Sequence, residues 1–201
     1  MSTHLRSTPF AVDPLFLERW SPRAFDGTSI DEEQLLTLFD AARWAPSAFN
    51  YQPWRFVYAQ RDSAVWQEFL DLLLPFNAAW VKDAAALIFV LSDTLIVPPG
   101  KSEAQPATSN SFDAGAAWAL LALQARRLGL HTHAMAGFDQ AKARGYFDLP
   151  DRYRIEAAIA VGHLGDKGKL PEALQAREVP SDRLPVEALA FRDGLPDDLA
   201  G

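Results

Sequence analysis

Apolar and polar residues follow two different periods along the chain, and these periods predict its helices and strands. Four short runs are rich in aromatic, β-branched or small apolar residues, which is typical of strands. They are residues 54–60, 84–92, 131–137 and 154–162. Segments between them repeat their apolar residues every three or four positions, which is typical of amphipathic helices. The sequence therefore predicts that helices and strands alternate.

The first main helix is expected to begin at Ser29, because Glu32 follows three residues later and completes a capping-box pattern. Its apolar residues share one face, and Pro46 is expected to end it. Asp62 is expected to cap a second helix that extends to about Leu74.

The strongest helix prediction covers residues 112–128. Asp113 lies in its first turn and Arg126 in its last, so both charges interact favourably with the helix dipole. Residues 114–117 are small, which lets another backbone come close. A shorter helix is expected within residues 138–148.

Two segments lack such a pattern. Residues 92–111 contain three prolines and are expected to form one long loop, of the kind that often covers a site. The chain from His163 onward is Pro-rich and polar, so it is expected to wrap another surface, such as a second copy. Residues 1–201 are interpreted as a single domain, either α+β or three-layered. No GxGxxG turn is present, so a Rossmann domain is not expected.

Composition narrows the range of partners. The net charge is −7 and no dense Lys/Arg block occurs, so neither nucleic acid nor an anionic membrane is an expected partner. The chain has no cysteine, which excludes disulfides and thiolate chemistry and fits a reducing cytoplasm. The longest apolar run, residues 84–91, is far shorter than the ~20 residues that span a bilayer. Neither export nor membrane anchoring is expected.

Hydrolase and kinase motifs are missing from the sequence, which has neither a GxSxG nucleophile elbow nor a P-loop. His131 and His133 would face one side of a strand and could form a metal pair. No third ligand is evident nearby, so structural or solvent-facing roles are the favoured interpretation.

Two separated basic segments could bind an anion. Arg19, Ser21 and Arg23 alternate, so in an extended chain all three face one way. Arg183 lies between prolines that would hold it in place. Each signal alone is weak, because a solvated basic edge gives the same pattern.

Residues 43–58, RWAPSAFNYQPWRFVY, place amide and hydroxyl side chains among large flat ones just before a strand. Such a surface suits a flat ligand with polar edges. Trp44 and Trp54 are expected to pack in the core, whereas Ser47 and Asn50 are candidates for ligand contact.

Taken together, these pieces resemble the nitroreductase-like flavoprotein family, which binds FMN at the interface of a homodimer. The resemblance covers nearly the whole chain, in order. RWSPRAF is similar to the family's Arg-x-Ser-x-Arg motif, APSAFNYQPWRF to its Pro-Ser-x-x-Asn-x-Gln-Pro-Trp turn, and NAAWVKDA to the segment beside the flavin's pyrimidine ring. AGF, AVGH and PSDRLP follow at the expected places. The resemblance implies an α+β fold with three α/β/α layers, a mixed sheet flanked by helices, and a C-terminal tail wrapping the dimer partner.

The resemblance also implies a set of FMN-binding residues. They are Arg19, Ser21, Arg23, Pro46, Ser47, Asn50, Asn77, Ala136, Gly137 and Arg183. Arg19, Ser21 and Arg183 would hold the phosphate, and Arg23 would lie near the N1/C2 carbonyl edge. Three phosphate donors without an adenine-binding signature favour FMN over FAD.

The ring would be held by both subunits. Pro46, Ser47 and Asn50 would come from one subunit to line an isoalloxazine held mostly by the other. Asn77 would meet the pyrimidine edge, and the backbone N–H of Gly137 would face flavin N5.

Two positions depart from the family's pattern. Some members have a lysine where Trp80 lies and a basic residue where Ser181 lies. Positive charge is therefore reduced both at the pyrimidine edge and around the phosphate, which affects the expected flavin potential and affinity.

The expected activity is an FMN-dependent oxidoreductase reaction with NAD(P)H as donor, in a ping-pong cycle that ends on a nitroaromatic or quinone-like acceptor. No catalytic side chain is expected, because the cofactor carries the chemistry. Two alternatives stay open. One is a related flavoprotein that dehalogenates a substrate or oxidises it with flavin and oxygen, and the other is a non-catalytic flavin-binding module. The sequence does not distinguish NADH from NADPH.

Overall fold

The computed structural model describes residues 6–196 and residue 199. Its centre is a four-stranded sheet in the order β1-β2-β6-β5. The strands are β1 (Trp54–Gln60), β2 (Ala86–Asp93), β6 (Tyr153–Gly162) and β5 (His131–Met135). Every pair in this sheet is antiparallel. The α+β class is confirmed, but the expected mixed sheet is wrong for the described part of one chain.

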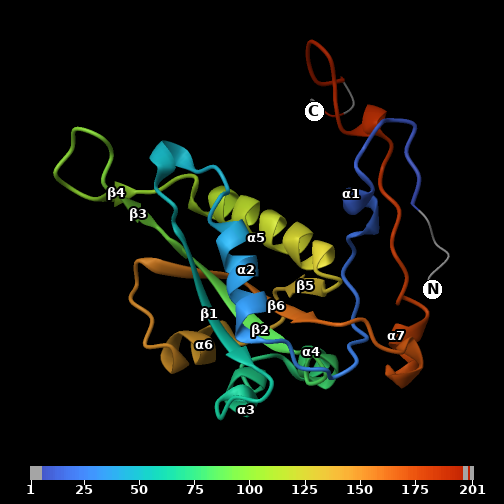
Figure 1. Ribbon diagram of the computed structural model, residues 1–201. Coiled ribbons are helices and arrows are strands. Elements are labelled where there is room, and N and C mark those ends of the chain that lie inside the picture. Colours follow the sequence, from blue (N-terminus) through green and yellow to red (C-terminus); the bar gives the residue numbers. More distant parts are fainter. Residues whose placement is uncertain (1–5, 197–198, 200–201) are drawn as a thin grey trace.

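Helices cover both faces of the sheet and give the expected three layers (Figure 1). One face carries α2 (Glu32–Ala42) and α5 (Asn110–Arg127). The other face carries α3 (Trp66–Leu70), α4 (Pro75–Val81) and α6 (Gln140–Tyr146).

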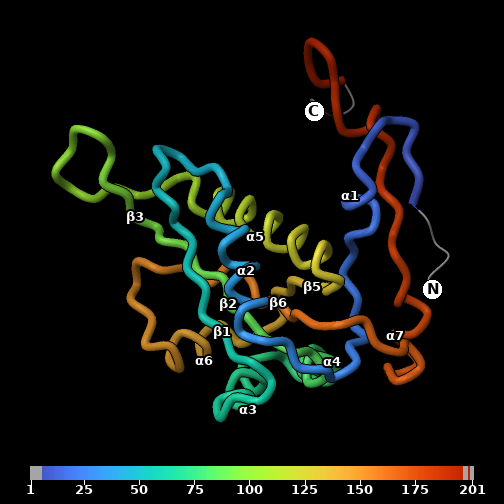
Figure 2. The backbone as a smooth tube through the Cα atoms, in the orientation of Figure 1, coloured from blue at the N-terminus to red at the C-terminus, as the bar shows by residue number. Residues whose placement is uncertain are grey.

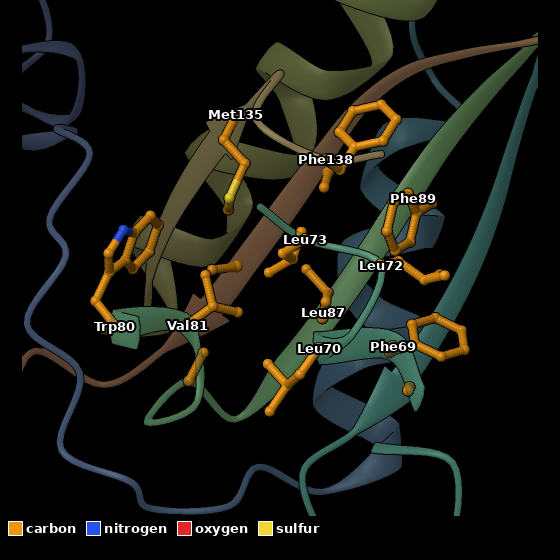
Figure 3. Close-up of a cluster of buried hydrophobic side chains, with 14 of the residues drawn as sticks. Phe69, Leu70, Leu72, Leu73, Trp80, Val81, Leu87, Phe89, Met135 and Phe138 are labelled. Atoms are coloured by element: carbon orange, nitrogen blue, oxygen red, sulfur yellow. The ribbon is translucent and has the colours of Figure 1, made fainter. Parts of the chain in front are cut away.

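The core is divided in two by strand β2, which is buried along its whole length. Its alternate side chains point to opposite faces. Ile88 and Val90 pack under α2 and α5, while Leu87 and Phe89 pack in the other cluster (Figure 3). The second cluster also holds Trp80 of α4, which matters for the site below.

The N-terminal segment and the tail run side by side away from the sheet (Figures 1 and 2). Arg6 Nε donates to the Ser181 carbonyl over 2.8 Å and joins the two. The short helices here and near the loops are α1 (Pro14–Glu18), α7 (Glu172–Gln175), η1 (Ala48–Asn50), η2 (Lys167–Lys169) and η3 (Val186–Ala188). No helix in the described part of the chain is long and apolar enough to cross a membrane.

The expected strands are confirmed within a few residues, and the expected helix at 112–128 is α5. The expected caps are wrong. Asp31, not Ser29, caps α2, with Gln34 as the reciprocal partner. Ser29 instead donates to the carboxylate of Asp62, the residue expected to cap the second helix. The two expected cap residues therefore bond to each other and not to helix N–H groups.

Two segment boundaries are also wrong. Helix α2 ends at Ala42, before Pro46. The helix expected from Asp62 to Leu74 is only the five residues of α3. The backbone of Leu73 pairs with that of Phe138 just before α6, so the chain leaves the helix to contact the segment after β5 in the same layer.

Residues 92–111 are not one structureless loop. Strand β2 continues to Asp93, and β3 (Leu95–Ile96) pairs with β4 (Gln105–Pro106) in a small hairpin that projects from the body (Figure 1).

Candidate functional site

Three arginines gather where the N-terminal segment meets the tail. Arg6 donates to the Arg19 carbonyl over 2.7 Å and to the Ser181 carbonyl beside Arg183. Burial, followed by the positive charges of Arg183 and Arg19, lowers the pKa of the Arg6 guanidinium, while the charge of Asp182 raises it. Burial and then Arg183 likewise lower the pKa of Arg19. The structure therefore brings Arg6, Arg19 and Arg183 together.

Within the described residues none of these three arginines forms an ion pair with a carboxylate. Among the described residues, Arg183 donates to Ser181 and to the carbonyl of Asp182 and to no other group. Three guanidinium groups that repel one another would be stabilised by a bound anion. A phosphate is an anion that guanidinium groups bind well.

The segment after Arg19 runs along β5, the edge strand of the sheet. Trp20 packs edge-on against His131, with ring centroids 6.1 Å apart. His133 Nδ1 lies 2.9 Å from the carbonyl of Pro22, which can only accept, so this nitrogen donates. Ser21 and Arg23 flank that proline.

Glu178 fixes this segment from the tail. Its buried Oε1 accepts from the backbone N–H groups of Arg23 and Ala24, over 2.6 and 2.7 Å. Burial and then the charge of Arg177 lower the pKa of the Arg23 guanidinium, while Glu178 raises it. The Arg23 Nε is buried and has no partner among the described residues.

Asn77 and Gly137 form one unit just beyond the end of β5. The Gly137 carbonyl accepts from Asn77 Nδ2 over 2.9 Å and from the backbone N–H of Leu74 over 3.0 Å. The Gly137 N–H has no partner among the described residues. A Cβ at position 137 would lie 2.2 Å from Asn77 Nδ2, so only glycine allows this approach. Ala136 beside it is exposed.

We call these residues the β5-edge group. It consists of Arg6, Arg19, Ser21, Arg23, Asn77, Ala136, Gly137 and Arg183.

Pro46, Ser47 and Asn50 lie elsewhere, around η1, and we call them the η1 group. The Ser47 hydroxyl accepts from the backbone N–H of Gln52 over 3.0 Å. Phe49, Asn50 and Gln52 have φ values of 52°, 55° and 53°. Three non-glycine residues in the left-handed region mark a strained turn, and such turns often occur at ligand sites.

Large aromatic side chains are exposed around the η1 group. Phe49 is 72% exposed and Phe112 is 81% exposed. Trp44 is 70% exposed, so its expected place in the core is wrong, whereas Trp54 is buried as expected. Trp44 does not reach the core because α2, whose apolar face packs there, has already ended at Ala42.

The η1 group and the N-terminal segment that carries Arg19 lie at opposite ends of α5 (Figure 1). Ala48 in η1 donates its N–H to Asp113 in the first turn, over 3.2 Å. Arg126 in the last turn pairs with Glu18, next to Arg19, over 3.0 Å. Thirteen residues at 1.5 Å rise separate these contacts by roughly 20 Å. One chain therefore does not bring the η1 group to the arginines.

The two histidines of β5 contact aromatic rings. His133 lies against Trp80, with centroids 4.8 Å apart. Burial, then Arg126 and His163, lower the pKa of His131 from 6.5 to about 4. Among the described residues no cluster of three or more His, Cys, Asp or Glu side chains could hold a metal ion.

Sequence reasoning missed Arg6 and Glu178. Neither stands in a motif, and they meet their partners across 175 and 155 residues of sequence. Only the fold makes them neighbours of the Arg-x-Ser-x-Arg segment.

Comparison with known proteins gives a consistent result. A model of the Nitroreductase family matches residues 17–163. A Thermus thermophilus protein named NADH dehydrogenase is 32% identical over 204 residues, which covers 87% of this chain and 92% of that protein. A Streptococcus pyogenes protein provisionally named NAD(P)H nitroreductase is 28% identical and covers 87% of this chain and 96% of its own.

Solved structures share the fold. One described as an oxidoreductase containing FMN is 48% identical, with a TM-score of 0.92, over 98% of this chain and 99% of that chain. A protein from Exiguobacterium sibiricum, solved in complex with FMN, is 26% identical, with a TM-score of 0.73, over 93% of this chain and 100% of that chain.

Proposed function

Because the chain belongs to the Nitroreductase family, we propose that it is an FMN-dependent oxidoreductase with NAD(P)H as its electron donor. The observation that carries this proposal is the cluster of Arg6, Arg19 and Arg183, which has no carboxylate partner within the described residues. The FMN found in similar structures has a terminal phosphate that fits this cluster. Residues 1–201 would act as one FMN-binding domain.

Each part of the β5-edge group would hold a different part of the cofactor. Arg19, Ser21 and Arg183 would hold the phosphate together with Arg6, which lies among them. Arg23 would lie at the N1/C2 carbonyl edge, where its buried, unpartnered Nε within the described structure calls for an acceptor.

The Asn77–Gly137 unit would hold the polar side of the ring. Because Asn77 Nδ2 is bound to the Gly137 carbonyl, its amide oxygen is left to accept from a ring N–H. The Gly137 N–H, unpartnered among the described residues, is left to donate near N5, with Ala136 beside it. These donors and acceptors fit the rim of an isoalloxazine.

A homodimer would complete the site. By the family resemblance, Pro46, Ser47 and Asn50 would reach the ring from the partner chain. In their own chain they lie roughly 20 Å from the arginine end of α5. The exposed faces of Phe49 and Phe112 would then be covered. Each dimer would have two equivalent sites.

When bound, FMN supplies the redox chemistry, because its ring accepts a hydride from NAD(P)H and gives it up to a second substrate. The chain's own residues bind and orient, and none of them needs to transfer a proton. After the oxidised nicotinamide leaves, an electron-poor acceptor such as a nitroaromatic or a quinone would take its place. This order of events is a ping-pong cycle.

Initial-rate kinetics without oxygen test this cycle. The rate of NADPH or NADH oxidation is measured against donor concentration at several fixed concentrations of a quinone, and separately of a nitroaromatic. A ping-pong cycle gives parallel double-reciprocal lines, whereas intersecting lines contradict it.

The same assay separates the alternatives. Turnover only with a halogenated aromatic, or only with oxygen as acceptor, would indicate the related flavoprotein chemistries. Flavin that binds but is never reduced by either nicotinamide would indicate a binding module.

A further inference from the structure

The η1 turn is strained, and hydrogen bonds hold it in shape. Phe49, Asn50 and Gln52 lie in the left-handed region, which non-glycine residues keep only where surrounding contacts fix them. The Ser47 hydroxyl accepts from the Gln52 N–H over 3.0 Å, and Gln52 Nε2 donates to the Asn50 carbonyl over 2.9 Å. Both bonds lie within the turn, so they set its shape but not its place on the molecule.

Asp113 links the turn to the rest of the molecule. Its side chain is 4% exposed, in the first turn of α5. Its Oδ2 accepts from the backbone N–H of Ala48 over 3.2 Å and from the Ser109 hydroxyl over 3.0 Å. Ala48 is the first residue of η1, and its N–H has no other acceptor among the described residues. One buried carboxylate therefore joins η1 to the helix.

The first turn of α5 is itself tied to the central sheet. Asn110 Nδ2 donates to Ser92 Oγ of β2 over 2.8 Å. Ser111 Oγ donates to Glu156 Oε1 of β6 over 2.8 Å, and Ser92 Oγ donates to the same oxygen over 2.5 Å. Asp113 therefore connects η1 to a base that two central strands hold in place.

We propose that Asp113 is a positioning residue, which holds the η1 group where it can reach the flavin ring of the partner chain. This rests on the proposed function. Asp113 is buried beneath η1 and would not contact the cofactor itself. The group that it holds would meet the ring and not the phosphate. Loss of Asp113 should therefore weaken the binding of the ring, and should do so at the partner's site.

The first test compares FMN with riboflavin, which has the same ring but no phosphate. Asp113→Leu keeps the approximate size of the buried side chain and removes the acceptor. The dissociation constants of FMN and riboflavin should both rise about tenfold, by the same factor. Asp113→Asn keeps an amide oxygen that can accept both bonds, so both constants should stay near those of the wild type.

Two other variants show whether the effect belongs to the ring. Arg183→Ala should weaken the binding of FMN and leave that of riboflavin unchanged, because riboflavin has no phosphate. Asp71→Leu is the matched control, because Asp71 is an exposed aspartate just after α3, in the opposite layer, and it should change neither constant. Wild-type constants for both ligands in Asp113→Leu, or a loss confined to FMN, would overturn the proposal.

Mixed dimers test whether Asp113 acts on the partner's site. One chain carries Asp113→Leu and the other Arg183→Ala, and two different tags allow only mixed dimers to be purified. If each η1 group serves the partner, one site has both residues intact and the other has both defects. FMN titration should then show wild-type affinity at one of the two sites. If neither site has wild-type affinity, Asp113 acts within its own chain, and the proposal fails.

Ala48→Pro removes the same hydrogen bond from its other side and keeps the proposal testable if Asp113→Leu does not fold. Proline lacks the N–H and is tolerated at the first position of a helix. Ser47 before it already has the extended backbone that a following proline requires. Ala48→Pro should raise both dissociation constants by the same factor, and unchanged constants would overturn the proposal. If the wild type binds neither FMN nor riboflavin, the proposed function itself fails.

Discussion

The proposed phosphate site depends on individual arginine side chains, and Arg183 is the most exposed part of it to test. Arg183 is exposed, and within the part of the chain that the structure describes it donates only to Ser181 and Asp182 of the tail. It nevertheless lies close enough to Arg6 and Arg19 to lower the pKa of both. Because its charge repels Arg6 and Arg19, Arg183 is not expected to stabilise the fold of the FMN-free protein. It is expected to contribute to the binding of an anion.

Arg183→Ala should therefore weaken FMN binding at least tenfold, since a hydrogen bond to a charged group contributes about 1.5–3 kcal/mol. The thermal stability of the FMN-free protein should be unchanged. Arg192→Ala is the control, because Arg192 is a 95% exposed arginine of the same tail. Equal FMN dissociation constants for Arg183→Ala and the wild type would remove Arg183 from the site.

At this scale the sequence predicted residues that stand in motifs and missed those that act alone. Arg183 lies close enough to Arg19 for its charge to lower the pKa of Arg19, and Asn77 lies against Gly137. Arg6 could not be predicted, because nothing in its local sequence shows that Ser181 lies beside it. The roles of all these residues toward FMN stay predictions until binding is measured.

At the scale of elements, the Arg-x-Ser-x-Arg segment depends on contacts from both sides. His133 of β5 holds it at Pro22, and Glu178 holds it at Arg23 and Ala24. The tail is thus part of the site before any partner chain is considered.

Glu178→Ala should lower the free energy of unfolding by about 3 kcal/mol, because two buried N–H groups lose a charged acceptor. FMN affinity should fall as well, since Arg23 is no longer fixed. Thermal denaturation and FMN titration measure the two effects, with the exposed Glu172→Ala as control. A variant as stable as the wild type would show that the tail does not position this segment.

Strands were easier to predict than helix ends. β1 and β2 are rich in aromatic, β-branched and other apolar residues, which are enriched in strands. Their composition alone was therefore enough to predict them as strands. A side chain caps a helix only if it is available to bond the helix N–H groups. Ser29 and Asp62 bond to each other, so neither caps the helix expected of it. Trp44 shows the same limit, because its exposure follows from where α2 ends.

At the scale of the molecule, one chain presents two incomplete groups at opposite ends of α5. The arm formed by the N-terminal segment and the tail also exposes apolar side chains that a single chain does not cover. Those that are more than half exposed include Phe10, Phe16, Leu184, Leu189 and Leu195. Both features are what a chain that pairs with a second copy requires.

Sedimentation of the FMN-loaded protein should accordingly give a dimer with one FMN per chain, burying about 2,000–5,000 Å². Dilution should release FMN and monomer together, because the η1 group comes from the partner. A stable monomer that keeps its FMN would contradict the shared site, although not the arginine cluster.

The visible spectrum of the FMN-loaded protein, before and after one equivalent of NADPH or NADH is added without oxygen, tests the central claim most directly. We expect that at least one nicotinamide removes the absorption band of oxidised flavin and that a quinone then restores it. A protein that does not hold FMN, or an FMN-loaded protein whose spectrum neither nicotinamide changes, would contradict it.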